Sequence, residues 1–217
     1  MSPQRWRLDG QLALVTGGSA GIGRAIAREL LGFGARVLIA ARDGNGLDAV
    51  RIELEEEFPD GEVRTFVSDV SDDEQRRELL DWVEDIGDGL NILVNNAGSN
   101  LTKSAIDYSE DEWRNIFETN LFSAFELARS TYPLLTKHAA SCIVNVGSVS
   151  AITHVRSGAP YGMSKAAMHQ MTRNLAVEWA EDGIRVNAVA PWYIRTARSE
   201  AALVDPAYLE EVLERTP

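Results

Sequence analysis

Residues 12–23, which read LALVTGGSAGIG, decide the fold. Leu12–Thr16 is a short apolar and β-branched run of the kind that forms a buried strand. Four of the next seven residues are glycines, and a helical pattern over Ile22–Leu31 follows. Glycines let the backbone turn sharply and approach a pyrophosphate, and a helix N-terminus offers N–H groups to that anion. The segment predicts a dinucleotide-binding turn; the alternative is an ordinary glycine-rich turn between a strand and a helix.

The same alternation of short apolar runs with helical patterns continues along the chain. The expected strands are Leu12–Thr16, Arg36–Ala40, Val63–Val67, Ile92–Asn95, Cys142–Val146 and Arg185–Val189. The expected helices are Ile22–Leu31, Leu47–Phe58, Asp72–Ile86, Glu112–Lys137 and Ser164–Ala180. Strands that alternate with helices indicate right-handed crossovers and a parallel sheet buried on both faces. The pattern predicts an α/β fold with a Rossmann-like, doubly wound parallel sheet in three layers, whose ligands bind beyond the carboxyl ends of the strands.

Composition narrows the classes of partner. The length of 217 residues fits a single domain over 1–217. A net charge of −12, without a Lys- or Arg-rich run, argues against nucleic acid and anionic membrane surfaces as partners, and the apolar stretches are too short to span a bilayer. Cys142 is the only cysteine, so an intramolecular disulfide is impossible and a reducing cytoplasm is the expected location. No set of ligands has the spacing of a metal site.

Further motifs follow in a fixed order. They are a G-x-x-x-G-x-G spacing at Gly17, Gly21 and Gly23, the segment Asn95–Gly98 after the fourth strand, Ser148 after the fifth, and Tyr161-x-x-x-Lys165. Together they resemble the short-chain dehydrogenase/reductase family, and residues 90–98 and 190–196 resemble its tropinone-reductase-like branch. The resemblance runs from about Leu8 to the end of the chain. It implies a nicotinamide-dependent oxidoreductase that passes hydride between its cofactor and a small ketone or secondary alcohol.

The end of the second strand bears on the choice of nicotinamide cofactor. Relatives that use NAD usually carry aspartate where this chain has Ala41, and Arg42 follows. A guanidinium binds the 2′-phosphate of NADP bidentately, so NADP is predicted, with NAD as the alternative. Arg42 is otherwise an exposed loop arginine whose charge Asp43 partly cancels. Ala20 stands where many NADP users have a second basic residue.

The resemblance assigns the remaining cofactor contacts. Asp69 and Val70 match the pair that meets adenine, although Asp69 is equally suited to cap the following helix. Thr196 is expected to bind the nicotinamide carboxamide, helped by Pro191 and the backbone of Ile194. The full set of expected cofactor residues is Gly17, Ser19, Ala20, Gly21, Ile22, Gly23, Arg42, Asp69, Val70, Asn96, Ala97, Gly98, Tyr161, Lys165, Pro191, Ile194 and Thr196.

Tyr161 and Lys165 are the expected acid–base pair. Four residues apart in a helix, they lie on one face, one turn apart. A tyrosine pKa is ordinarily about 10, and a nearby ammonium lowers it toward the range of a useful acid–base catalyst. Ser148 is expected to donate a hydrogen bond to the substrate carbonyl, so Ser148 and Tyr161 are the expected substrate contacts. The sequence signals no histidine or acidic partner for Ser148, so it does not indicate a hydrolase triad.

Asn120 completes the expected catalytic set of Asn120, Ser148, Tyr161 and Lys165. It lies inside the predicted helix Glu112–Lys137, and the resemblance implies that it holds a water connecting Lys165 to solvent. Each residue has a structural alternative: a surface pair for Tyr161 and Lys165, a cap for Ser148, and a packing amide for Asn120. Trp192, after Pro191, is expected either to wall the substrate pocket or to pack under its loop.

The resemblance also implies an assembly and an incomplete end. Members of the family continue with a further helix and a final parallel strand, so the domain is expected to be C-terminally incomplete and its sheet to lack the last edge strand. Relatives pair the helices matching Glu112–Lys137 and Ser164–Ala180, which implies a homodimer or homotetramer. The alternative to an enzyme is a non-catalytic dinucleotide-binding scaffold.

Overall fold

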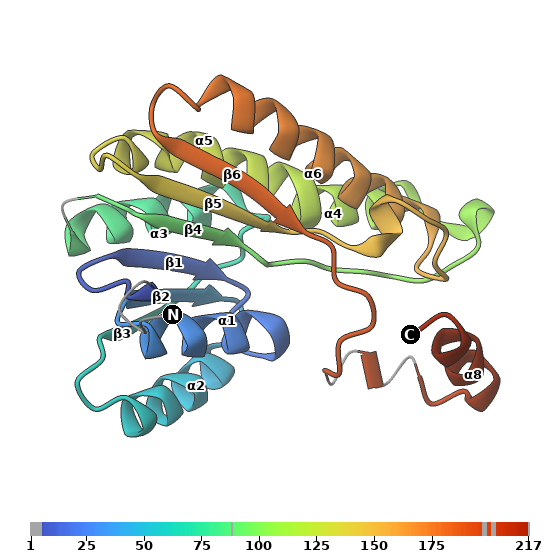
Figure 1. The fold of residues 1–217 in the computed structure, drawn as a ribbon. Helices are drawn as coiled ribbons and strands as arrows, with labels where there is room; N and C mark the ends of the chain where they lie inside the picture. The colour runs from blue at the N-terminus through green and yellow to red at the C-terminus, as the bar shows by residue number, and fades with distance from the viewer. Residues whose placement is uncertain (1–5, 88, 197–198, 201–202, 217) are drawn as a thin grey trace.

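The computed structural model describes residues 6–87, 89–196, 199–200 and 203–216. Residues 1–5 and Pro217, the two ends of the expected domain, lie outside the described residues. Within the described ranges six parallel strands form one sheet (Figure 1). They are β1 (Leu12–Thr16), β2 (Arg36–Ala41), β3 (Val63–Val67), β4 (Ile92–Asn95), β5 (Ser141–Val146) and β6 (Ile184–Val189). Their order, β3-β2-β1-β4-β5-β6, confirms the predicted doubly wound fold.

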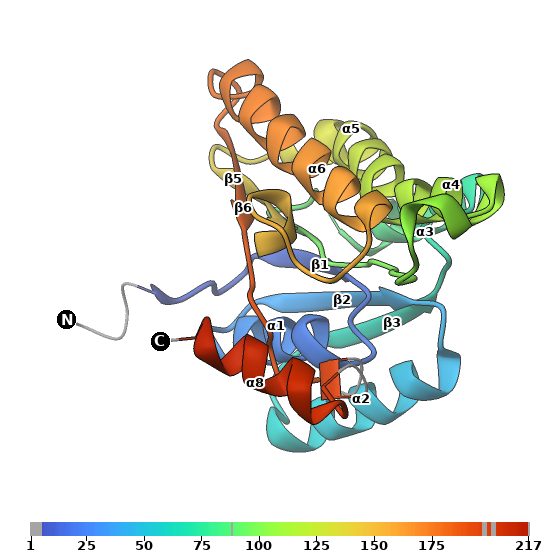
Figure 2. The same cartoon turned by 90° about the vertical axis from the view of Figure 1, so that its right-hand side faces the viewer.

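Helices cover both faces of the sheet, as Figure 2 shows. One apolar cluster joins strand residues such as Val15 and Ile39 to α1 (Gly21–Gly32) and α2 (Gly44–Glu57). A second joins alternate strand residues such as Leu14 to α3 (Asp73–Ile86), α5 (Ser123–Leu135) and α6 (Ala159–Glu178). Because successive side chains of a strand point to opposite faces, the nearly continuous apolar runs supply both clusters. The three layers were predicted correctly.

The predicted helix Glu112–Lys137 is wrong as a single regular helix. The chain instead forms α4 (Glu110–Phe117), a π-helical turn labelled η3 (Glu118–Phe122) and then α5, which ends at Leu135. The π turn contains Asn120, whose side chain is held by segments far away in sequence, described below. A π turn inside an α-helix widens the helix locally and commonly marks a functional position.

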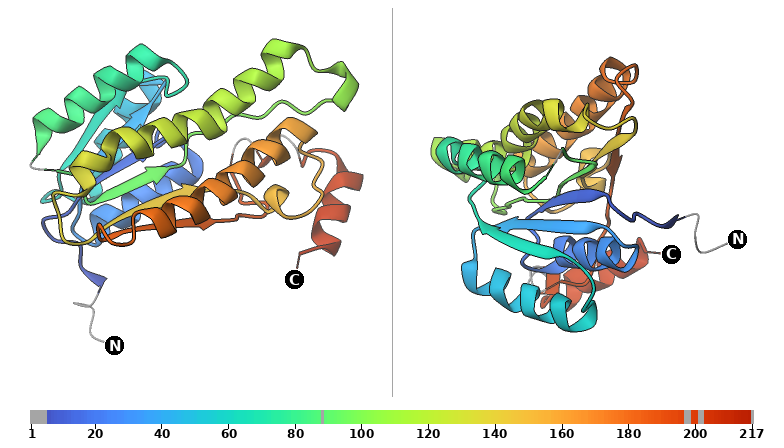
Figure 3. Two further views of the ribbon diagram at one scale, coloured as in Figure 1. Left: turned by 90° about the horizontal axis from the view of Figure 1, so that it is seen from above. Right: turned by 90° about the vertical axis from the view of Figure 1, so that its left-hand side faces the viewer.

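One other helix prediction needs correction, and one helix was missed. α6 begins at Ala159 rather than at Ser164, because Pro160 is well placed in the first turn of a helix. A further helix, α8 (Pro206–Glu214), was not predicted. It begins after Asp205, whose side chain accepts a hydrogen bond from the Ala207 N–H. α8 lies beyond the carboxyl ends of the strands, near the start of α6 (Figure 3).

The sheet ends at β6 in the described part of the chain. There β6 pairs on one side only, with β5, in the register Ile143↔Val186. Val189, at the end of this strand, is exposed. Among the described helices, none combines the length and the apolar character that crossing a membrane requires.

Candidate active site

The glycine-rich turn is shaped by close backbone contact with the segment that follows β4. Gly17 has a φ of +65°, and a Cβ atom there would lie 2.9 Å from the Cα of Ala97. A Cβ at Gly23 would collide with the Gly17 carbonyl and the Asn96 amide. The Asn96 Nδ2 donates to the carbonyl oxygens of Thr16 and Gly17, at 2.9 and 3.0 Å. Glycine is therefore required at both positions before any ligand is considered.

A cavity of about 970 Å³ opens at this edge of the sheet, where the carboxyl ends of the strands meet. It brings together nearly all the residues that the sequence nominated. Those lining it are Gly17, Ser19, Ala20, Gly21, Ile22, Arg42, Asp69, Val70, Asn96, Ala97, Gly98, Ser148, Tyr161, Lys165, Pro191, Ile194 and Thr196. The two nominated residues that do not line it, Gly23 and Asn120, lie behind its wall.

An ion pair joins two residues that line the cavity, one after β2 and one after β3. Ala41 is buried, and the Arg42 side chain, 63% exposed, places its Nη1 3.5 Å from the Asp69 Oδ2. Burial alone would raise the pKa of Asp69, but hydrogen bonds from Ser71 and the charge of Arg42 together lower it. The alternative role of Asp69 as the cap of α3 falls instead to Asp72, which accepts a hydrogen bond from the Gln75 N–H at 2.9 Å.

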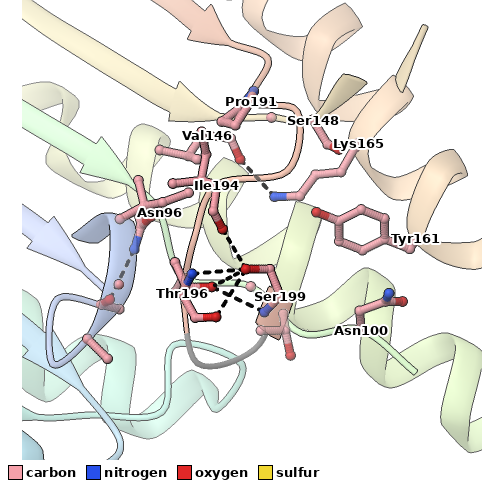
Figure 4. A pocket seen from close by; sticks show the side chains of 18 of the residues that line it. Asn96, Asn100, Val146, Ser148, Tyr161, Lys165, Pro191, Ile194, Thr196 and Ser199 are labelled. Carbon is pink, nitrogen blue, oxygen red and sulfur yellow. Dashed lines mark hydrogen bonds between the residues drawn. The ribbon is translucent and has the colours of Figure 1, made fainter. Parts of the chain in front are cut away.

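Thr196 lies over the glycine-rich turn and is held by Ser199, which the sequence analysis did not nominate. A Cβ at Gly21 would lie 3.1 Å from the Thr196 methyl group. The Thr196 N–H donates to the Ser199 hydroxyl at 2.9 Å, and that hydroxyl donates to the Ile194 carbonyl at 2.6 Å (Figure 4). These bonds fix the loop after β6 against the cavity.

The nominated catalytic side chains come from α6 and from the end of β5. Lys165 is a buried residue, 3% exposed. Its Nζ lies 5.9 Å from the centre of the Tyr161 ring and donates to the Val146 carbonyl at 2.8 Å. Figure 4 shows the Tyr161 hydroxyl pointing toward the end of the Lys165 side chain. The Ser148 hydroxyl accepts from the Ser150 N–H at 3.1 Å, which caps a short 3-10 turn, η4 (Val149–Ala151). Ser148 thus acts as the cap that was its structural alternative, and it also lines the cavity.

Asn120 is completely buried and joins three parts of the chain. Its Oδ1 accepts from the Ser99 N–H at 2.7 Å, and its Nδ2 donates to the Ser99 carbonyl at 2.9 Å and to the Ser164 hydroxyl at 3.1 Å. The Ser164 hydroxyl donates in turn to the Tyr161 carbonyl at 2.8 Å. A Cβ at Gly98 would lie 3.2 Å from the Asn120 Oδ1 and 3.7 Å from the Lys165 Nζ. The three hydrogen bonds fix the orientation of the amide, and both the amide and the Lys165 ammonium lie close to Gly98.

His169, one turn beyond Lys165 on α6, is a second polar group close to the site. Its Nε2 is buried and has no hydrogen-bond partner among the described residues. Burial, followed by the charges of Arg173 and Lys165, lowers the pKa of His169. The imidazole is therefore favoured in its neutral form beside the Lys165 ammonium.

The wall nearest Ser148 and Tyr161 contains residues that the sequence analysis missed. Trp192, which the sequence analysis did name, lines the cavity, and its Nε1 donates to the Thr216 hydroxyl, after α8, at 2.9 Å. Tyr193 lines it as well, with its hydroxyl hydrogen-bonded to that of Tyr208 on α8. Burial and this bond raise the pKa of Tyr193. Arg156, from the loop before α6, completes the wall.

Comparisons with known proteins agree with this arrangement. The family model of short chain dehydrogenases matches residues 11–205. A tropinone reductase homologue of Arabidopsis thaliana, At5g06060, is 44% identical over 216 residues, which cover 99% of this chain and 81% of the relative. A solved structure of a short-chain alcohol dehydrogenase assigned in Sinorhizobium meliloti 1021 has a TM-score of 0.91 and 36% identity, and covers 98% of this chain and 83% of its own.

A second solved structure is that of an NAD(P) dependent gluconate 5-dehydrogenase assigned in Beutenbergia cavernae, with bound NADP. It has a TM-score of 0.91 and 34% identity, over 100% of this chain and 84% of its own. The resemblance to the tropinone-reductase-like branch is confirmed by the Arabidopsis relative. The extent of the family match and of these identities shows that the chain belongs to the short-chain dehydrogenase family and is an oxidoreductase.

Proposed function

We propose that the protein is an NADP-dependent oxidoreductase that reduces a ketone, or oxidises a secondary alcohol in the reverse direction. The observation that carries the proposal is the buried Lys165 ammonium, 5.9 Å from the Tyr161 ring in a cavity that Ser148 also lines. A buried cation beside a phenol favours the phenolate form, which is what an acid–base tyrosine needs.

The cavity fits a dinucleotide. The turn at Gly17 and Gly23 leaves no room for a Cβ. Gly21 is the first residue of α1, and the N–H groups at a helix N-terminus can donate hydrogen bonds to a pyrophosphate. Asp69, Val70 and residues 96–98 would hold the adenosine half, and Thr196 with Pro191 and Ile194 would hold the nicotinamide half. When bound, the nicotinamide supplies or accepts the hydride. The Beutenbergia cavernae relative carries NADP in its structure.

NADP is preferred over NAD because of the charges at the end of β2. Ala41 offers no carboxylate to a ribose hydroxyl, and the exposed Arg42 guanidinium offers a fork of donors to a phosphate. Asp69 steadies Arg42 through an ion pair. An exposed ion pair of this kind is weak, about 0–1 kcal/mol, so it leaves the guanidinium able to take a phosphate.

Four side chains take part in the proton chemistry. Ser148 donates a hydrogen bond to the substrate oxygen as negative charge develops there. Tyr161 gives its phenolic proton to that oxygen, and in the reverse direction the phenolate removes it. Lys165 stabilises the phenolate. Asn120 is held by Ser99 and Ser164, lies close to Gly98 as the ammonium does, and is the proposed holder of a water that reaches solvent.

Assembly, domain organisation and location are also proposals. The described chain is proposed to be a single domain that assembles as a homodimer or homotetramer through α5 and α6, where Phe125 and Val177 are exposed. The cytoplasm remains the proposed location. Light scattering after size-exclusion chromatography tests the assembly, and a monomer at micromolar concentration would reject it.

The proposed function is tested by following NADPH oxidation against a panel of diverse ketones. At least one ketone should be reduced, and NADH should serve less well than NADPH. Binding of NADPH without reduction of any ketone, and without oxidation of any secondary alcohol by NADP, would reject the enzyme and support the dinucleotide-binding scaffold.

A further inference from the structure

The carboxylates that line the cavity lie at one of its ends. These two, Asp43 and Asp69, follow β2 and β3, at the end proposed for adenosine, where the cations Arg24 and Arg42 also line the cavity. Around Ser148 and Tyr161, the charged side chains among the described lining residues are Lys165 and Arg156, both cations. In a protein with a net charge of −12, this purely cationic end is contrary to the overall balance. Lys165 interacts with the Tyr161 ring and with the Val146 carbonyl. Arg156 is therefore the cation that the part of a substrate remote from its reacting carbon would meet.

Arg156 is held in place from α8. Its guanidinium carbon lies 5.1 Å from the centre of the Tyr208 ring, and its Nη2 forms an ion pair with Glu211. Stacking on an aromatic ring orients the guanidinium plane and leaves its edge for hydrogen bonds. Glu211 is not among the described residues that line the cavity, whereas Arg156 and Tyr208 are. The cavity is therefore lined by the cation of this ion pair and not by its carboxylate.

The ion pair with Glu211 leaves Arg156 able to bind a second anion. The Arg156 side chain is 58% exposed, and an exposed pair is a weak interaction. A guanidinium carries five N–H donors, more than one carboxylate occupies, so it can bind a second anion while α8 keeps its place. A cationic amine would meet like charge at this end of the cavity, because the Glu211 carboxylate, which pairs with Arg156, is not among the described lining residues.

We propose that the substrate carries a carboxylate remote from its ketone or alcohol group, and that Arg156 binds this carboxylate. The inference rests on the proposed function, because it takes Ser148 and Tyr161 as the place of the reacting carbon. Arg156 would then be the residue that selects acidic substrates over neutral and amine-bearing ones.

Matched pairs of ketones test the proposal in the intact protein with NADPH. Pyruvate, acetoacetate and levulinate place the carboxylate at increasing distance from the ketone carbon, and each is compared with its methyl ester. For at least one acid, kcat/KM should exceed that of its ester. Arg156→Leu should lower kcat/KM for that acid by about 10- to 150-fold, the range for a hydrogen bond to a charged group, and leave the ester within about twofold.

Glu211→Gln is the matched control for damage to α8. It breaks the same ion pair but keeps the guanidinium, so it should leave activity on the acid unchanged or higher. Equal losses in Arg156→Leu and Glu211→Gln would assign Arg156 to the packing of α8 and overturn the proposal. Acids and esters that react equally well, with Arg156→Leu indistinguishable from the wild type, would also overturn it.

A binding measurement separates this inference from the proposed function. Calorimetric titration of each acid into the NADPH complex of Tyr161→Phe reports binding without turnover. Arg156-dependent binding of an acid, with no ketone reduced by the wild type, would support the anion site and reject the proposed function. Reduction of neutral ketones with no acid bound would reject the anion site and leave the proposed function standing.

Discussion

The side-chain amide of Asn120 donates a hydrogen bond to the hydroxyl of Ser164 across 3.1 Å. The bond joins the π turn η3 to α6, the helix that carries both Tyr161 and Lys165. Both side chains are completely buried. Because Ser164 donates onward to the Tyr161 carbonyl, its hydroxyl can only accept from Asn120, and this fixes which end of the amide faces Ser164.

Ser164→Ala should therefore impair catalysis through Asn120, making Ser164 a positioning residue. The buried amide loses a partner and its freedom to turn increases, so we expect kcat to fall by about tenfold, in line with a lost buried hydrogen bond. The dissociation constant of NADPH should stay unchanged. The pH profile of kcat should shift, since the Asn120 amide and the Lys165 ammonium both lie close to Gly98.

Thr172→Val provides the control for Ser164→Ala. Thr172 is a buried hydroxyl further along α6 that accepts from Asn145 and donates to the Met168 carbonyl. Its loss should lower the free energy of unfolding without moving the pH profile. Identical pH profiles for Ser164→Ala and the wild type would show that Ser164 has only a structural role.

Gly17→Ala should destabilise the protein and abolish NADPH binding. Gly17 has a φ of +65° and a Cβ there would lie 2.9 Å from the Ala97 Cα, whereas Gly10 has a φ of +78° and nothing within 4 Å of such a Cβ. Gly10→Ala should thus cost only the left-handed backbone strain, about 1–2 kcal/mol in urea unfolding. Gly17→Ala should cost more, and only Gly17→Ala should affect NADPH affinity. Equal costs for the two variants would refute steric crowding at the turn.

Arg42→Ala should weaken NADPH binding by about 10- to 150-fold and NADH binding by less than about threefold, because only NADPH offers a 2′-phosphate to the guanidinium. Arg64→Ala is the control, since Arg64 is an exposed arginine on the adjacent β3 that pairs with Glu62 outside the cavity. Fluorescence titration of each reduced cofactor measures both constants. Parallel losses for the two cofactors in Arg42→Ala would contradict the NADP preference.

His169→Gln should alter the pH dependence of stability. Burial, with the charges of Arg173 and Lys165, lowers the pKa of His169 below its ordinary value of 6.5, so the folded state resists its protonation. Its contribution is complete above about pH 6.5 and is lost as the pH falls through the folded pKa. Urea midpoints should therefore fall less steeply with acidification in His169→Gln than in the wild type. His154→Gln, at an exposed loop position, is the control, and equal slopes for the two variants would contradict the assignment to His169.

Much of the fold could be predicted because its strands are buried on both faces. The apolar run Leu12–Thr16 has the same bounds in the sequence pattern and in the structure. The π turn could not be predicted, because Asn120 is held by Ser99 and Ser164 from distant segments. The apolar pattern of α5 does not indicate those bonds.

The part of the cavity wall formed by Arg156 and Tyr208 could not be predicted either, for a related reason. Arg156 and Tyr208 come together only because α8 returns to the loop before α6. One signal was present and unused: Asp205-Pro206 is a good start for a helix, a capping side chain followed by proline. Ser164 could have been nominated from its position three residues after Tyr161, on a neighbouring part of the helix surface.

The most direct measurement compares the turnover of Tyr161→Phe with that of the wild type, on the ketone that the wild type reduces best. The substitution removes the phenolic proton and keeps the ring beside Lys165. We predict that kcat falls by about 10²- to 10⁴-fold, the usual contribution of a general acid, while the dissociation constant of NADPH is unchanged. A Tyr161→Phe variant that turns over at the wild-type rate would contradict the assignment of Tyr161 as the proton donor.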